Sequence, residues 1–193
     1  MPFRGKLKFR LNENTIWITS DLHFGHKNIL RFSPGTRPFE NIEEMDEALI
    51  KEWNDKVQPN DIIIHLGDLS FYKEEKTKEI LSRLNGRKIF ILGNHDWVVR
   101  NHIKVGDYGI EGIYDYLEMN VDGTKVCLFH YPMLTWNSSH YGSVHFFGHC
   151  HGSLPERKGR QMDVGYDNIG YISNIKECMD LMLQKPIHKV DGH

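Results

Sequence analysis

Five short apolar segments, each followed by polar side chains that can bind a metal, constrain what this chain can fold into. The clearest lies within 88–96, KIFILGNHD, where residues 89–92 form a continuous apolar run with β-branched and aromatic members. Such a run is typical of a strand buried on both faces. Gly93 then permits a sharp turn, because it has no Cβ. The segment predicts a central strand followed by a loop that carries Asn94, His95 and Asp96.

Four further apolar runs end in the same way. They cover residues 15–20, 61–66, 125–130 and 144–148, and they deliver Asp21 and His23, Asp68, His130, and His149 and His151 in that order. Residues two apart in an extended segment project to the same side, so Asp21 and His23 can hold one ion together. With Asn94, the strand ends supply seven candidate ligands, which is too many for one ion. Two ions sharing a bridging carboxylate would use them all.

The ligand types also favour certain metals. Imidazole, carboxylate and amide ligands without thiolate favour transition metals over Ca²⁺ or a structural zinc cage. We therefore expect two divalent transition-metal ions, with manganese as the favoured metal and Fe, Zn, Co or Ni as the alternatives.

Turn residues and helical periodicity predict the elements between these strands. Helices are expected from residue 42 to the stop at 59–60, over 73–84, near 97–101 and over 173–184. An edge strand is expected within 1–11, a short strand at 162–165, and a hairpin of 113–121 with 125–130 around Asp122-Gly123. His65 lies inside a predicted strand and is interpreted as a buried core histidine, and Cys150 is expected to pack inward. We expect one domain over residues 1–193.

Composition excludes several classes of protein. The net charge is −2, so no global basic field exists to hold a long nucleic acid. Three cysteines without CxxC spacing predict reduced thiols and a cytoplasmic location. No run approaches the roughly 18 apolar residues of a membrane span. Neither a membrane nor a protein partner is implied.

Four other polar residues are candidates for contact with a substrate. His26 and Asn28 follow the first ligand pair closely, and they are equally well explained as residues at a helix start. Arg37 lies in the proline-containing loop 33–41 and could bind a phosphate through two hydrogen bonds, although a solvated loop arginine is the simpler interpretation. His140 lies in the polar segment 133–142, which is expected to form part of the rim of the site.

The ordered motifs DLHFGH, GD, GNHD, FHYP and GHCH resemble the calcineurin-like metallophosphoesterase superfamily, whose pattern is D-x-H, GD, GNH(D/E), H and GHxH. The match spans residues 21–151, and the short chain is similar to small bacterial or phage-type members. The resemblance implies a four-layer α/β/β/α sandwich. It also implies one ion on Asp21, His23, Asp68 and His151, and a second on Asp68, Asn94, His130 and His149. Asp68 would bridge the ions, and His95 would act on the leaving group.

A closely spaced metal pair serves phosphoester hydrolysis, because both ions hold the phosphate while a bound water is acidified to hydroxide. Gly67-Asp68 continues as LSFYKEE rather than the VDRG of Ser/Thr protein phosphatases, which argues against a phosphoprotein substrate. We expect a phosphodiesterase acting on nucleotide-like or other small substrates, including short nucleic acids, with small phosphomonoesters as the competing class. A non-catalytic scaffold of the same fold is the third alternative. It is disfavoured because every motif position, including His95, is filled.

Overall fold

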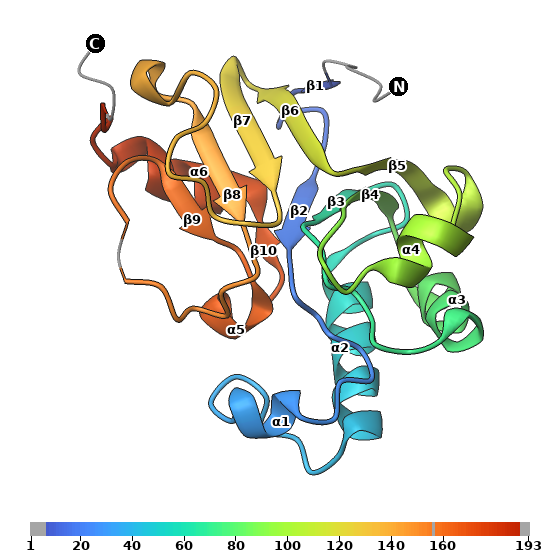
Figure 1. Cartoon of the computed structure of the whole chain (residues 1–193). Helices are drawn as coiled ribbons and strands as arrows, with labels where there is room; N and C mark the ends of the chain where they lie inside the picture. The colour runs from blue at the N-terminus through green and yellow to red at the C-terminus, as the bar shows by residue number, and fades with distance from the viewer. Residues whose placement is uncertain (1–6, 156, 190–193) are drawn as a thin grey trace.

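The computed structural model describes residues 7–155 and 157–189, which form two five-stranded sheets flanked by helices (Figure 1). Sheet I has the order β10-β2-β3-β4-β5, and its strands β2 to β5 are parallel. Sheet II has the order β1-β6-β7-β8-β9, and only the β6–β7 pair is antiparallel. The strands of sheet I are β10 (Ser173–Asn174), β2 (Ile16–Thr19), β3 (Ile62–His65), β4 (Arg87–Ile91) and β5 (Ile110–Tyr114). Those of sheet II are β1 (Leu7–Phe9), β6 (Tyr116–Val121), β7 (Thr124–Phe129), β8 (Val144–Phe147) and β9 (Gln161–Asp163).

Amphipathic helices connect and cover the strands. The helices are α1 (Ile29–Phe32), α2 (Ile42–Lys56), α3 (Glu74–Arg83), α4 (Trp97–His102), α5 (Tyr166–Ile169) and α6 (Ile175–Gln184), with 3₁₀ turns at Asp107–Gly109 and Ser139–Tyr141. Helix α2 begins where the Asn41 side chain accepts a hydrogen bond from the Glu44 amide. No helix in the described ranges combines the length and apolar character that a membrane crossing requires.

Two apolar cores hold the layers together. The first lies between sheet I and its helices, where Met45, Leu49 and the fully buried Trp53 of α2 pack with Ile63 and Phe90. The second lies between the two sheets and includes residues of α6, which contacts β2 and β10 of sheet I and β8 and β9 of sheet II. The predicted α/β sandwich, with two sheets flanked by helices, is confirmed.

The ligand-bearing strand ends meet where the two sheets approach each other. The Asp21 amide donates to the Gly67 carbonyl at 2.9 Å, and the Gly148 amide donates to the His130 carbonyl at 2.9 Å. A Cβ at Gly148 would collide with the side chains of Ser20 and Asp21, so only glycine allows the β8 loop to approach β2 this closely. Short loops at these strand ends therefore bring distant motifs together.

One strand prediction is wrong, and another falls partly outside the described residues. Residues 113–121 are not a single strand, because the chain passes from sheet I to sheet II at Asp115, between β5 and β6. The predicted hairpin is formed by β6 and β7, and Asp122 and Gly123 adopt the positive φ values, 47° and 85°, that its tight turn needs. The predicted edge strand is present as β1, which pairs with β6, whereas residues 1–6 lie outside the described ranges.

Candidate metal centre

The structure gathers the candidate ligands into two adjacent groups. Asp21, His23 and His151 each offer one ligand atom, and these atoms lie within 4.8 Å of one another. Asp68, His130 and His149 form a second group under the same limit. These groups match the division into two ligand sets that the motif resemblance implies.

Asp68 lies between the two groups. Its Oδ2 is 3.9 Å from Nε2 of His23 in the first group and 3.5 Å from Nε2 of His130 in the second. Oδ1 of Asn94 lies 3.2 Å from the same His130 nitrogen, which adds an amide oxygen to the second group. Burial alone would raise the pKa of Asp68, but the interaction with His130 and other nearby groups lowers it to about 2. The carboxylate is therefore ionised and positioned to bridge two cations.

Polar atoms left without partners in the first group suit a cation. Oδ1 of Asp21 is buried and has no hydrogen-bond partner among the described residues. The Nε2 atoms of His23 and His151 face each other at 3.2 Å and lie 3.6 Å and 3.8 Å from that oxygen. Buried polar groups in native proteins are normally satisfied, so two converging imidazole nitrogens and a bare carboxylate oxygen fit a bound metal ion.

The backbone at these ligands is strained. Asp21, His23, Asp68, His149 and His151 all have positive φ, between 48° and 68°. Such conformations cost roughly 1–3 kcal/mol each in non-glycine residues and cluster at functional sites. Tight loops thus turn these side chains, from the ends of β2, β3 and β8, toward the two ligand groups.

Hydrogen bonds to the other ring nitrogen fix two of the histidines. Nδ1 of His130 lies 2.7 Å from the Leu66 carbonyl oxygen, and Nδ1 of His151 lies 2.6 Å from Oδ2 of Asp167. Because these oxygens accept, each Nδ1 carries the proton and each Nε2 keeps its lone pair for a metal. The hydrogen bond to Asp167 also raises the pKa of His151 above its usual value.

Arg37 corrects a sequence expectation. It is neither a solvated loop residue nor a phosphate clamp, because it is 1% exposed and forms a buried two-point ion pair with Asp167, with Nε to Oδ1 at 2.7 Å. Its Nη2 also donates to the carbonyl oxygen of Asp21 at 2.6 Å, and its Nη1 donates to that of Leu22 at 2.7 Å. Arg37 therefore ties the first ligand loop to the carboxylate that orients His151. Asp167 was missed by the sequence argument, since it lies outside every motif.

Asp96 connects the loops after β3 and β4. It directly precedes α4, yet its side chain makes no cap hydrogen bond to that helix. Instead, its carboxylate accepts the amide protons of Asp68, Leu69 and Gly93 at 2.8, 2.9 and 2.8 Å. This buried acceptor holds the bridging Asp68 against the loop that carries Asn94 and His95.

His95 and His26 lie at the mouth of the centre, on either side of the Phe71 ring. The centroid of His95 is 4.4 Å from that of Phe71 and 6.0 Å from that of His23. The His95 amide donates to Oδ1 of Asp68 at 2.8 Å, which positions the residue beside the candidate ions. His26 stacks on Phe71 at 4.1 Å, and burial followed by the charge of His23 lowers its pKa to about 4.

The other residues singled out from the sequence lie elsewhere. Asn28 is exposed just before α1. His140 lies in the 3₁₀ turn before β8, so it is near the end of that strand opposite to His149, and the structure does not bring it to the ligands. His65 is a core residue, as predicted, since it is 1% exposed and its pKa is lowered by burial to about 3. Cys150 is half-buried rather than packed inward.

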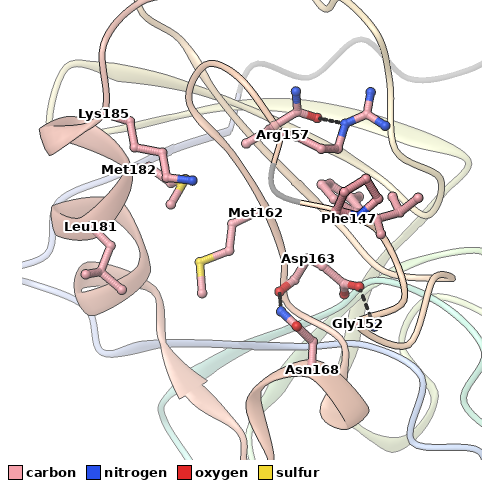
Figure 2. A pocket seen from close by; sticks show the side chains of 12 residues that line it. Phe147, Gly152, Arg157, Met162, Asp163, Asn168, Leu181, Met182 and Lys185 are labelled. Atoms are coloured by element: carbon pink, nitrogen blue, oxygen red, sulfur yellow. Dashed lines mark hydrogen bonds between the residues drawn. The ribbon is translucent and has the colours of Figure 1, made fainter.

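A cavity of about 360 Å³ lies beside the His149–His151 loop, between sheet II and α6 (Figure 2). Its lining is largely apolar and includes Phe147, Met162 and Met182, and none of the candidate ligands contributes to it. Asp163 on its wall accepts the Gly152 amide at 3.1 Å and so braces the ligand loop from behind. The cavity is therefore separate from the ligand groups.

Comparison with known proteins agrees with this geometry. The chain is 39% identical over 140 residues to the Methanocaldococcus jannaschii protein named Uncharacterized protein MJ1445, covering 72% of this chain and 70% of that one. It is 28% identical to the Gene 66 protein of Mycobacterium phage L5, covering 91% and 97% of the two chains. The crystal structure of AQ665 from Aquifex aeolicus shares the fold, with a TM-score of 0.66, 24% identity and coverage of 87% and 99%. The family model for calcineurin-like phosphoesterases matches residues 14–193, and the chain therefore belongs to that family.

Proposed function

We propose that this protein is a phosphodiesterase that uses two divalent transition-metal ions, with manganese favoured, to hydrolyse nucleotide-like or other small phosphodiesters. The observation that carries the proposal is the place of Asp68 between two ligand groups. Asp21, His23, Asp68 and His151 would hold one ion. Asp68, Asn94, His130 and His149 would hold the other. Such a pair, when bound, supplies positive charge to the phosphate and acidifies a water.

His95 is the proposed general acid. It lies beside Asp68 but outside both ligand groups, and its side chain is exposed toward the mouth of the centre. Water oxygen forms the new bond to phosphorus while the bond to the leaving oxygen breaks. His95 gives its proton to that leaving oxygen, so the products are a phosphomonoester and an alcohol. General-acid assistance of this kind contributes typically 10²- to 10⁴-fold to the rate.

A substrate panel tests the reaction class. It should contain phosphopeptides, aryl phosphomonoesters and phosphodiesters, cyclic nucleotides, and short single-stranded DNA and RNA, each assayed with manganese. The proposal expects turnover of the small diesters and little turnover of phosphopeptides, because the net charge of −2 offers no basic docking field and the protein-phosphatase sequence is absent. A clear preference for phosphomonoesters or phosphopeptides would refute the diesterase assignment.

Substitution of His95 tests its role. His95→Ala should leave the metal content intact and slow an alkyl or nucleoside ester severely, whereas a p-nitrophenyl ester, whose leaving anion hardly needs a proton, should suffer far less. His140→Ala is the matched control, since that histidine lies near the opposite end of β8. If both esters slowed equally with the metals still bound, His95 would act by positioning the phosphate. Loss of the metals would make it a ligand.

A further inference from the structure

A second cavity lies directly beside His95. Its volume is about 490 Å³, within the range of small-molecule sites. The segment between β3 and α3 forms one wall, and helix α4 with His95 forms the other. Its lining includes Phe71, Lys73, Glu74, His95, Trp97 and His102.

Two exposed aromatic side chains dominate this cavity. Phe71 is 40% exposed and Trp97 is 63% exposed, so part of each ring is accessible to an incoming ligand. The Phe71 ring is also 5.2 Å from that of His23, a candidate metal ligand, and 4.4 Å from that of His95. The aromatic surface therefore begins at the metal centre and continues past the proposed general acid.

The charges of the cavity are compatible with an anionic ligand. Glu74, the one carboxylate among the described residues that line the cavity, is already paired with Lys78 at 2.5 Å and His102 at 2.7 Å. Lys73 is exposed and has no acidic partner within the described part of the chain. Aromatic faces combined with an available cation are the features by which proteins bind single nucleotides and nucleic-acid strands without base-specific hydrogen bonds.

We infer that this cavity binds the leaving nucleoside of a nucleotidyl phosphodiester, with its base against the accessible parts of the Phe71 and Trp97 rings. The inference rests on the proposed function, because the leaving oxygen must emerge on the side where His95 protonates it. His95 forms part of the wall of this cavity, so the departing group enters it directly. The substrate is then a dinucleotide or the end of a short strand rather than a simple alkyl diester.

Two dinucleoside phosphodiesters that differ only in the leaving residue provide the test. One carries a thymine base on the leaving residue, and the other has a tetrahydrofuran abasic residue with the same leaving oxygen. Analysis of the products identifies which of the two residues is the leaving group. Stacking on aromatic side chains should make kcat/KM for the base-bearing diester about 5- to 150-fold higher. Trp97→Ala and Phe71→Ala should each lower this ratio, and Trp97→Phe should restore most of it. Tyr141→Ala removes an aromatic that is 82% exposed in the 3₁₀ turn before β8 and should leave the ratio unchanged.

A binding measurement is independent of turnover. Adenosine added to metal-free protein should show saturation-transfer NMR signals from its base protons, and these should weaken in Trp97→Ala but not in Tyr141→Ala. Equal kcat/KM for the two diesters in the wild type, or a ratio insensitive to both aromatic substitutions, would overturn the inference and leave the phosphodiesterase assignment intact. Absence of turnover of both diesters would overturn the proposed function and, with it, this inference.

Discussion

Replacing Asp167 by asparagine should destabilise the protein strongly, although no motif contains this residue. Its carboxylate forms a buried ion pair with Arg37, in which the two side chains are 1% and 0% exposed. Burial alone would raise the pKa of Asp167, but its hydrogen bonds with His151 and Arg37 hold that pKa far below the usual range. Asp167→Asn would leave the Arg37 charge buried without a counter-charge. Removing one partner of such a pair costs about 3–5 kcal/mol.

The assays are urea and thermal unfolding of metal-free protein, which separate the effect of the ion pair from any effect of bound metal. For a chain of this size, each kcal/mol shifts Tm by about 2–4 °C, so Asp167→Asn should lower Tm by roughly 6–20 °C. Asp180→Asn is the control, because Asp180 pairs with Lys176 on the surface, where the side chains are 55% and 61% exposed. Exposed pairs of this kind contribute at most about 1 kcal/mol.

A second readout concerns the metal centre. Asp167 orients His151, and loss of a partner that orients a metal-binding histidine typically weakens metal affinity 10- to 100-fold. Combining Arg37→Met with Asp167→Asn should cost less than the sum of the two single changes, because the buried charge is then gone. A loss below 1 kcal/mol in Asp167→Asn, or one equal to that of Asp180→Asn, would refute the reasoning.

Two further predictions concern the loops and the pH dependence. Asp96→Ala should lower the free energy of unfolding by about 3 kcal/mol or more, since two buried amides and one part-buried amide lose their acceptor. Asp96→Asn should cost less, and a loss under about 1 kcal/mol for Asp96→Ala in urea unfolding would contradict this prediction. The hydrogen bond to Asp167 raises the pKa of His151 in the folded protein above 6.5, so its contribution to metal-free stability is fully present below pH 6.5 and is lost as pH rises through the folded pKa. Because the pKa of His130 is raised as well, urea unfolding between pH 5.5 and 8.5 should show a steeper loss of stability in the wild type than in His151→Ala.

The candidate ligands could be predicted because they follow directly from strand ends. Apolar runs identify buried strands, and parallel strands place their carboxyl ends at one edge, so the residues after them converge. The positions of Asp21, Asp68 and His130 therefore required only the recognition of three strands. The positive φ values of Asp21 and Asp68 could not be predicted, because aspartate adopts such values more often than most residues but does not require them.

Long-range pairings could not be predicted in the same way. The flexible side chain of Arg37 can point to solvent or inward, and its inward position depends on Asp167, which is 130 residues away and follows no strand motif. The division of 113–121 between two sheets depends on a crossing at Asp115 that an alternating pattern does not reveal. His140 was expected at the rim of the site, but its loop lies near the beginning of β8. Tertiary contacts that the sequence does not reveal set the path of this loop, including the hydrogen bond from Lys125 to Ser138 at 2.9 Å.

Metal titration of the wild type and two aspartate variants tests the central claim most directly. Elemental analysis at saturating manganese, combined with calorimetric titration, should give two ions per wild-type chain, since the ligands form two groups around Asp68. Asp21→Ala should weaken mainly one ion, whereas Asp68→Ala should weaken both. A single ion per wild-type chain at saturation, or an Asp68→Ala variant that still binds one ion with unchanged affinity, would contradict the account.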